Sequence, residues 1–381
     1  MSYLEYRVRS VPTGFSKLLH LNWALVFLIT AVAVMSCVML YSVGGSFSKW
    51  ADPQLKRFIA TFFLMFIMAM IPIWFWRNMS FLAYGATLFL TILVSIMGST
   101  GMGAQRWIDL GFIRLQPSEL AKLGIVMALA AYYDVLPEHK VSRPLWVALP
   151  LVLIALPVIL VLRQPDLGTA ILIMLGGGSV MFLAGVHWAY FATVIATGTI
   201  AVLAVFQSRD TPWQLLKDYQ YKRIDTFLDP SSDPLGAGYH ITQSKIALGS
   251  GGVSGRGLTQ GTQSQLNFLP EKHTDFIFTT LAEELGFVGG ISLLGIYILI
   301  LILCLISAIE AKDKYSFLLI SGIAMTFFLF FAVNMSMVMG LMPVVGVPLP
   351  LISWGGSAML VLMAGFGLIQ SAYVHRPRAK K

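Results

Sequence analysis

Long apolar stretches recur along almost the whole chain, and they leave few folds open to it. Counted against the ~20 residues that a hydrocarbon core of ~30 Å requires, there are about ten of them. Each is expected to be a helix, because backbone exposed to lipid must satisfy its own hydrogen bonds. The expected spans are residues 22–41, 58–75, 81–97, 117–133, 145–162, 167–184, 188–206, 285–309, 315–339 and 351–373.

Composition agrees with a membrane protein. Hydrophobic residues make up 57% of the chain and charged residues only 12%, whereas soluble domains carry about 25% charged residues. Cys37 and Cys304 both lie in apolar runs, which argues against a disulfide framework or a structural zinc site. We therefore expect residues 1–381 to form one all-α, polytopic, integral membrane domain.

The distribution of Lys and Arg predicts how the spans are oriented. Basic residues are more frequent in the loops that share a side with the termini, which indicates that residues 1–21 and the basic tail 374–381 are cytoplasmic. Residues 22–206 then hold the first seven helices, and residues 285–373 hold the eighth to the tenth. The formal net charge of +8 follows from this topology, and nucleic acid is not an expected partner.

Residues 207–284 form a single long outer loop that is rich in Gly, Pro, Gln and Ser. Loops longer than ~15 residues inside a compact fold are usually functional or disordered. Apolar residues in 213–227 have loosely helical spacing and predict a helix on the membrane surface. The sequence DPSSDP from Asp229 should end that helix.

A glycine cluster lies in the middle of this loop, at Gly249–Gly252 and again around Arg256. Successive backbone N–H groups in such a segment can bind phosphate. The segment lacks the Walker sequence and its strand–helix context, so a nucleotide site is rejected. The alternative is a flexible loop, and we expect residues 235–266 to be a mobile, basic cover.

Asp275 stands where the outer loop meets the eighth span. A carboxylate at the edge of a low-dielectric region can have its pKa raised toward neutrality and can act as a general base. Because the sequence FIF follows it, spacing alone favours Asp275 as a plain helix N-cap, which is compatible with a role as base. His273 and His240 nearby are either metal ligands or hydrogen-bonded polar residues.

Glu119 and Lys122 are three residues apart at the start of the fourth span. That spacing puts them on one helix face, where they can pair, and charges inside a span usually face each other or a cavity. In the alternative, Glu119 only stabilises the first helical turn and Lys122 extends outward to the membrane surface.

Further basic residues are expected on the same outer side, namely Arg106, Arg163, Lys245 and Arg256. A phosphorylated lipid would require such a cluster. Trp107 accompanies Arg106, although tryptophan is also typical of a membrane interface.

Five motifs in order resemble the SEDS family (shape, elongation, division and sporulation), and the likeness is strongest to its RodA branch. They are GAQRWIDLGFIRLQPSELAKL, QPDLGTA, DPLGAGYHITQSKIALGSGG, LPEKHTDFIF with LAEELGFVG, and MPVVGVPLPLISWGGSA. The resemblance extends over residues 22–373. It implies ten transmembrane helices with one large extracytoplasmic loop between the seventh and the eighth.

The resemblance also implies an activity and a set of site residues. The expected activity is a peptidoglycan glycosyltransferase of the bacterial inner membrane that polymerises lipid II for cell-wall elongation and rod shape. It would work with a class B penicillin-binding protein and other proteins of the elongation complex. The catalytic aspartate corresponds to Asp275, the intramembrane pair to Glu119 and Lys122, and the loop tryptophan to Trp107. Relatives often carry an acidic residue where this chain has Asn267.

The expected mechanism is an inverting transfer in which Asp275 deprotonates the acceptor hydroxyl and undecaprenyl diphosphate leaves. The charge that develops on the diphosphate requires stabilisation. Arg106, Lys245 and Arg256 are the candidates for this, or a divalent cation such as Mg²⁺ or Mn²⁺. Gln263 and His273 are expected to support the site.

Two other functions remain open from the sequence, a lipid II flippase and a non-catalytic scaffold of the elongation complex. A flippase would need a polar path through the whole bilayer. Ionisable residues are concentrated in the outer half of the spans, which favours the enzyme.

Overall fold

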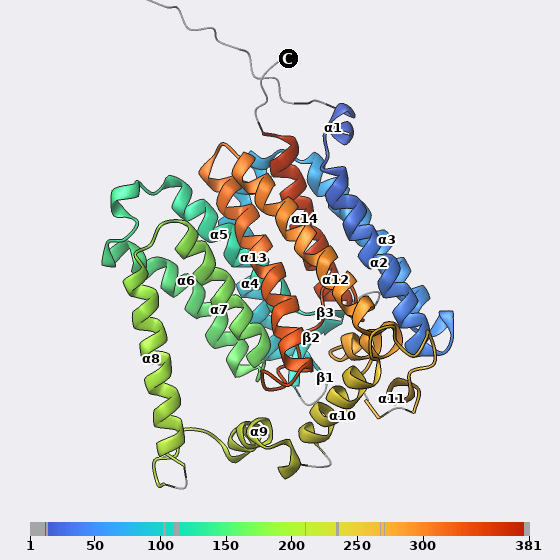
Figure 1. The fold of residues 1–381 in the computed structure, drawn as a ribbon. Coiled ribbons are helices and arrows are strands. Elements are labelled where there is room, and N and C mark those ends of the chain that lie inside the picture. The colour runs from blue at the N-terminus through green and yellow to red at the C-terminus, as the bar shows by residue number, and fades with distance from the viewer. Residues whose placement is uncertain are drawn as a thin grey trace, which may run out of the picture.

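The computed structural model describes residues 12, 14–101, 104–109, 111, 114–209, 211–233, 236–266, 268–269 and 271–376. Long helices packed side by side form a bundle (Figure 1). The helices are α1 (Ser16–Leu19), α2 (Trp23–Gly44), α3 (Asp52–Met70), α4 (Ile73–Met97), α5 (Pro117–Val135), α6 (Pro144–Arg163), α7 (Leu167–Leu183), α8 (Trp188–Gln207), α9 (Asp218–Leu228), α10 (Ala237–Ser250), α11 (Thr262–Gln265), α12 (Ile277–Glu310), α13 (Lys314–Val338) and α14 (Gly356–Val374). A π-helical turn (Phe47–Ala51) precedes α3, and 3₁₀ turns occupy Glu138–Lys140 and Pro230–Ser232.

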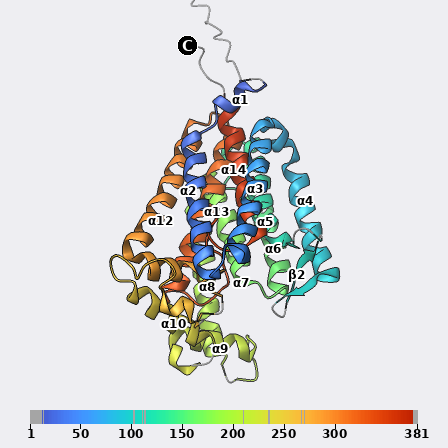
Figure 2. The same ribbon diagram turned by 90° about the vertical axis from the view of Figure 1, so that its right-hand side faces the viewer.

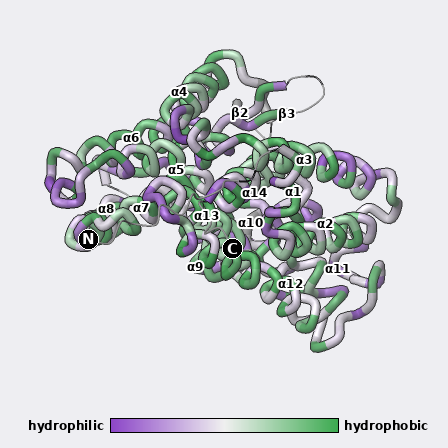
Figure 3. Tube along the Cα trace, turned by 90° about the horizontal axis from the view of Figure 1, so that it is seen from above, coloured by the Kyte–Doolittle hydropathy of each residue, from purple (hydrophilic) through white to green (hydrophobic). Residues whose placement is uncertain are grey.

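Each of the ten predicted spans falls mainly on a helix of its own, α2 to α8 and α12 to α14, although the span 58–75 also reaches the first residues of α4. Within the described residues, eight helices are long and apolar enough to cross a membrane, while α7 is shorter. The remaining helix of the ten, α5, is less apolar because it contains the charged residues Glu119, Lys122 and Asp134. Hydrophobic residues cover most of the helices and hydrophilic ones gather where the chain turns (Figure 3). The protein is therefore a polytopic helical membrane protein, as the apolar stretches predicted.

Several helix boundaries differ from those expected, and two of these differences bear on the site. Helix α3 begins at Asp52, with a proline in its first turn, so Arg57 belongs to a helix and not to a loop. Proline is favoured there because its missing N–H is not needed. Helix α12 begins at Ile277, eight residues before the predicted start of that span, and contains a break at Gly286 (φ 69°, ψ −164°).

The centre of the bundle is formed by α5, α13 and α14, most of whose side chains are buried. Close approach of the central helices depends on Gly322 of α13. A Cβ at this position would lie 2.6 Å from Val126 of α5 and 2.6 Å from Val180 of α7. The centre is thus too tightly packed at this level to accept a side chain.

The two ends of the bundle differ. Helix α1 and the last turn of α14 lie at one end, whereas α9, α10, α11 and a small sheet lie at the other, which we call the loop end (Figures 1 and 2). The sheet consists of β1 (Ser99–Gly101), β2 (Ala104–Asp109) and β3 (Arg114–Leu115) in the order β1-β2-β3, with antiparallel pairs.

Helix α8 stands at the edge of the bundle (Figure 1), and none of its residues is buried. At the loop end it is joined to α9. Arg209 makes two hydrogen bonds of 2.7 Å to Asp225, and the Tyr221 hydroxyl donates to the backbone oxygen of Val205 at 3.0 Å. The predicted helix 213–227 is shorter than expected because it begins only at Asp218, and the DPSSDP sequence ends it as predicted.

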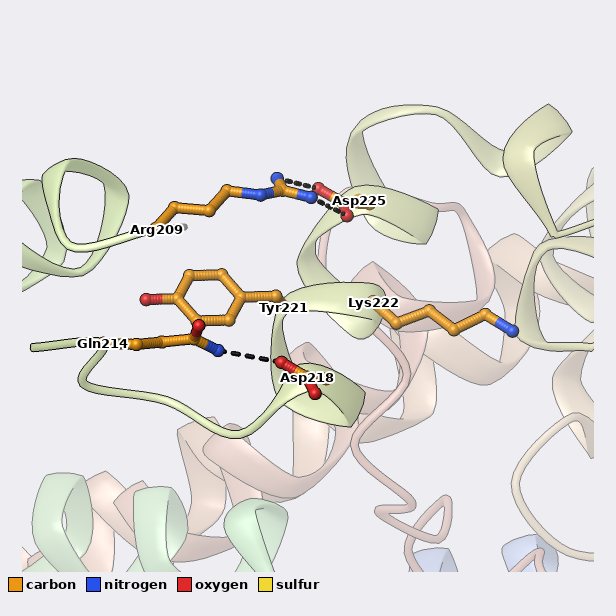
Figure 4. A pocket seen from close by; sticks show the side chains of 6 residues that line it. All are labelled: Arg209, Gln214, Asp218, Tyr221, Lys222 and Asp225. Carbon is orange, nitrogen blue, oxygen red and sulfur yellow. Dashed lines mark hydrogen bonds and ion pairs between the residues drawn. The ribbon is translucent and has the colours of Figure 1, made fainter. Parts of the chain in front are cut away.

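The α8–α9 junction encloses a shallow pocket of about 140 Å³ (Figure 4). Arg209 and Asp225 line it together with Gln214, Asp218, Tyr221 and Lys222. None of the candidate residues from the sequence lines this pocket, and its charged side chains have partners within the protein: Arg209 pairs with Asp225, Asp218 accepts from Gln214, and Lys222 pairs with Asp233. This pocket is therefore separate from the candidate residues around Asp275.

Candidate active site

The glycine cluster packs against the break in α12. Four backbone hydrogen bonds of 2.9–3.1 Å join residues 252–257 to residues 283–288: Arg256 N to Glu283 O, Gly257 N to Glu284 O, Phe287 N to Gly252 O, and Val288 N to Val253 O. The expectation of a loose glycine-rich cover is therefore wrong for this segment. Residues 235–266 contain helix α10 and then a stretch that is bonded along its length to α12.

Close approach explains why glycines occur in this segment. Gly255 has a positive φ of 80°, and a Cβ there would lie 2.1 Å from the backbone oxygen of Glu284. A Cβ at Gly251 would lie 2.0 Å from the backbone oxygen of Ala282. These glycines let two backbones touch, which is a packing role and needs no phosphate.

Two buried carboxylates anchor the same segment. Glu283 accepts hydrogen bonds from the backbone N–H of Gln263 (2.9 Å) and of Ser264 (3.2 Å). Glu284 accepts one from the Ser42 hydroxyl of α2 at 2.5 Å. Gln263, predicted as a supporting residue, thus contributes its backbone to the anchoring of Glu283.

Asp275 is held by its backbone. The side-chain amide of Asn334 in α13 donates to the backbone oxygen of Asp275 (2.8 Å) and to that of Val347 (2.7 Å). The Ser353 hydroxyl donates to the backbone oxygen of Thr274 at 2.6 Å. The N-cap of α12 is Phe276, with no side-chain cap, so the prediction that Asp275 is a plain N-cap is wrong.

The carboxylate of Asp275 has no hydrogen-bond partner among the described residues, and the residue is partly exposed. Burial of the group raises its pKa to about 6, and the negative charges of Glu271 and Asp166 contribute to the rise. Such a carboxyl is largely ionised at neutral pH, yet it holds a proton more tightly than an ordinary aspartate. This combination suits a general base.

Asp166 approaches the site from the start of α7, and sequence reasoning assigned it no role. Its carboxylate accepts from the Thr169 N–H (3.2 Å) and from the Gln116 side-chain amide (2.9 Å). A Cβ at Gly168 would lie 2.6 Å from the backbone oxygen of Val345, and one at Gly346 would lie 3.4 Å from the Asp275 carboxylate. Residues 345–347 therefore fit between the start of α7 and Asp275.

Glu119 and Lys122 form a buried ion pair within α5. The Lys122 ammonium lies 2.5 Å from a carboxylate oxygen of Glu119, and the two side chains are 1% and 6% exposed. The ammonium also lies 4.0 Å from the centroid of the Phe330 ring of α13. The pairing prediction is confirmed, and the alternative that Lys122 extends outward is wrong.

His273 belongs to an aromatic cluster. Its ring stacks on Trp50 (centroids 4.4 Å apart), and Trp50 meets the Trp354 ring edge-on at 4.9 Å. Burial lowers the pKa of His273 despite the opposing charge of Glu271, so the imidazole is neutral at pH 7. The backbone oxygen of His273 accepts from Trp354 N at 2.9 Å, which fixes this cluster beside Asp275.

The predicted basic residues have separate partners. Arg106 donates to the backbone oxygens of Gln164 (2.9 Å) and Pro165, tying the sheet to the turn before α7. Arg256 is exposed and donates to Ser250 O and Thr262 Oγ1. Lys245 is exposed, with its stem against Gly340. Each of the three thus has its own surroundings at the surface, and their joint binding of a phosphate stays a prediction.

Trp107 lies on β2, partly exposed and opposite Ser99 in the sheet. Asn267 lies outside the described residues. Across the part of the chain that the structure describes, no three His, Cys, Asp or Glu side chains gather as metal ligands. Participation of a divalent cation therefore stays a prediction, since Mg²⁺ is usually held by one or two carboxylates together with substrate phosphates.

Comparison with known proteins places this geometry in a family. A family profile of the FtsW, RodA and SpoVE proteins, described as cell cycle protein, matches residues 16–378. The chain belongs to this family. In the FtsW/RodA/SpoVE family, the peptidoglycan glycosyltransferase MrdB of Escherichia coli K12 is 42% identical over 366 residues, which cover 95% of this chain and 96% of that protein.

Other members are similar over most of the chain. A probable peptidoglycan glycosyltransferase FtsW of Buchnera aphidicola (subsp. Schizaphis graminum) is 36% identical, covering 82% of this chain and 87% of that one. The crystal structure of the rod shape determining protein RodA of Thermus thermophilus matches with a TM-score of 0.71 and 29% identity, covering 94% of this chain and 98% of that chain. A chain in a peptidoglycan synthase complex matches with a TM-score of 0.77 and 32% identity, covering 93% and 97%.

The FtsW/RodA/SpoVE motifs in this chain converge at the loop end. Asp166 and Asp275 come from two of the motifs and lie near residues 345–347 of the fifth, while Trp354 of that fifth motif bonds to His273 O. Sequence reasoning missed two residues here, Asp166 and also Arg57, whose guanidinium lies 3.9 Å from the centroid of the Trp354 ring. The motif QPDLGTA could have indicated Asp166, whereas Arg57 lies in no motif.

Proposed function

We propose that this chain is a peptidoglycan glycosyltransferase that polymerises lipid II into glycan strands for cell-wall elongation. The observation that carries the proposal is Asp275. Its backbone is fixed by Asn334, its carboxylate is unpaired within the described residues, and its pKa is raised to about 6. The family membership and the names of the relatives supply the reaction class.

In the reaction, the Asp275 carboxylate takes the proton of the 4-hydroxyl of the acceptor N-acetylglucosamine. The oxygen then forms a bond to the anomeric carbon of the donor N-acetylmuramic acid. The bond from that carbon to the diphosphate breaks, and its electron pair leaves with undecaprenyl diphosphate. Attack opposite the leaving group inverts the configuration, and protonated Asp275 returns its proton to water.

The fold supports a location for this reaction. The protein is a multi-pass bacterial membrane protein, and its first and last described segments lie at the end opposite α10 and α11 (Figure 1), which flank the segment that is bonded to the start of α12 next to Asp275. With both termini cytoplasmic in the inner membrane, as the Lys and Arg distribution predicts, Asp275 faces the periplasm. The match to a chain of a peptidoglycan synthase complex supports a class B penicillin-binding protein as partner.

The test is polymerisation of purified lipid II in detergent by the purified protein with its penicillin-binding partner. Asp275→Asn should lower the rate by about 10²–10⁴, the usual contribution of a general base. The matched control is Asp218→Asn, the same change at an exposed residue of the α9 pocket, and it should polymerise normally. Normal glycan chains from Asp275→Asn would overturn the assignment of the base.

Detergent also separates the enzyme from the two other functions. A flippase or a scaffold makes no glycan strand in a single compartment. Failure of the wild-type protein to form strands from lipid II, under conditions where a known polymerase does, would leave those two functions as the candidates.

A further inference from the structure

Arg57 carries a guanidinium whose hydrogen-bond donors are unused. Its charged centre lies 3.9 Å from the centroid of the Trp354 ring. It forms no side-chain hydrogen bond or ion pair with any residue that the structure describes. A guanidinium has five N–H donors in its plane, and stacking on an aromatic ring occupies only its face. The edge of Arg57 therefore remains available to a ligand.

Several other basic residues around the loop end use their charge within the protein, whereas Lys49, Arg163 and Lys245 lie exposed at the surface. Lys56 pairs with Asp52 at 2.7 Å, and Arg114 pairs with Asp109 at 3.3 Å. Arg106 and Arg256 donate to protein oxygens as described above, and Lys272 donates to Ser264 O. Arg57 differs from these paired residues. Its guanidinium is positioned by stacking on Trp354, and its N–H groups make no hydrogen bond to a described residue.

Arg57 is tied to the catalytic segment through Trp354. The Trp354 backbone N–H donates to His273 O at 2.9 Å, two residues before Asp275. The preceding residue, Ser353, donates to Thr274 O. The ring that supports Arg57 is thus bonded to the backbone that presents the base.

The first turn of α14 adds a positive field beside Arg57. A Cβ at Gly356, the first residue of α14, would lie 3.6 Å from Cδ and from Nε of Arg57. The helix has no side-chain cap at Gly355, and helix N-termini attract anions. Together with Arg57, this surface favours a ligand that carries several negative charges.

We propose that Arg57, stacked on Trp354, binds the diphosphate of the lipid-linked donor and holds it against the first turn of α14. This inference rests on the proposed glycosyltransferase reaction. A planar fork suits two phosphate oxygens better than a point charge does. As the bond from the anomeric carbon to the diphosphate breaks, Arg57 stabilises the negative charge that moves onto the leaving oxygen. It thereby takes the role that the sequence suggested for Arg106, Lys245 and Arg256.

The first experiment measures binding to the purified full-length protein in detergent. The probes are undecaprenyl diphosphate and undecaprenol, which has the same tail without phosphate. Arg57→Gln should weaken diphosphate binding about 10- to 100-fold, as expected for the loss of charge-assisted hydrogen bonds, and should leave undecaprenol binding unchanged. Lys56→Gln, the adjacent exposed cation, is the matched control and should bind both probes normally.

Arg57→Lys and Trp354→Leu separate charge from geometry. Lysine keeps the charge but loses the fork, so we expect intermediate diphosphate affinity. Leucine removes the stacking surface and should weaken diphosphate binding while Arg57 is still present. Equal loss of undecaprenol and diphosphate binding in Arg57→Gln would mean a structural role and would overturn the proposal. If Arg57→Gln does not fold, Arg57→Lys serves instead. A selective loss of affinity for undecaprenyl diphosphate over undecaprenol then supports the proposal, and an equal loss for both probes overturns it.

Kinetics then distinguish this proposal from the proposed function. Arg57→Gln should lower kcat for lipid II polymerisation as well as raise KM, because the charge matters most as the bond breaks. If Arg57→Gln has the same kcat, KM and diphosphate affinity as the wild type, the role of Arg57 is overturned. The proposed glycosyltransferase function is then unaffected. A wild-type protein that makes no glycan from lipid II would instead overturn the proposed function, and the binding comparison would still decide on Arg57.

Discussion

One side-chain amide, that of Asn334, fixes Asp275 by donating to its backbone oxygen at 2.8 Å and to Val347 O at 2.7 Å. The carboxylate is left unpaired among the described residues, so neither an arginine nor a lysine lowers its pKa. Burial and the charges of Glu271 and Asp166 raise that pKa to about 6 instead.

The pH dependence of polymerisation should report this pKa. Only ionised Asp275 can accept a proton, so kcat/KM should be constant above about pH 7 and fall about tenfold per unit below pH 6. A rate profile that stays flat down to pH 4.5 would contradict the assignment. Asp166→Asn keeps an N-cap for α7 but removes one negative charge, so it should shift the acid limb to lower pH.

The folding stability of the protein should also depend on the protonation of Asp275, and it should fall as pH rises, whereas activity should increase. The folded pKa lies above the unfolded value of 3.8, so between pH 3.8 and about 6 the folded state binds more protons and its stability falls as pH rises. Asp275→Asn should therefore unfold at a higher temperature than the wild type at pH 8. The difference should shrink toward pH 4, as measured by thermal unfolding in detergent.

The buried pair Glu119–Lys122 should be sensitive to the loss of one partner. Lys122→Met leaves an unpaired buried carboxylate, which typically costs about 3–5 kcal/mol. The exposed pair Asp52–Lys56 offers the control, because Lys56→Met should cost less than about 1 kcal/mol. The reversed pair, Glu119→Lys with Lys122→Glu, should retain partial polymerisation. Wild-type stability of Lys122→Met would rule out a structural ion pair.

Gly255 provides a test of the bonded loop. Alanine there meets the backbone oxygen of Glu284 and must also adopt φ 80°, so we expect a loss of about 1–3 kcal/mol in unfolding free energy. Gly252 has a positive φ of 54° but open space around it, so Gly252→Ala should cost only about 1 kcal/mol. Equal melting temperatures for the two variants would show that the segment does not pack as described.

Divalent ions should bind with the substrate and not before it. Since no three-ligand group exists in the described parts of the chain, we expect a Mg²⁺ or Mn²⁺ ion to enter on the diphosphate. Equilibrium dialysis should then find no stoichiometric Mn²⁺ on the substrate-free protein, and chelation should lower polymerisation but not the melting temperature. Tight Mn²⁺ binding that Asp275→Asn abolishes would show a protein-held site.

The helices could be predicted from the sequence because lipid requires long apolar stretches, and every predicted span has its helix. The pair Glu119–Lys122 followed from helical spacing, and Asp275 from its motif and position. The packing of residues 252–257 on α12 could not be predicted, because backbone hydrogen bonds between distant segments leave no periodic pattern. Arg57 was missed for a related reason, since its partner Trp354 is almost 300 residues away in the chain.

The break at Gly286 changes how the outer loop should be regarded. A helix interrupted near a membrane has backbone amides that lipid cannot satisfy, and here Gly252 O and Val253 O accept from two of them. The loop is thus an integral part of the secondary structure of a spanning helix. A chimera that exchanges residues 236–266 between relatives should therefore fold only if it also carries the matching first turns of α12.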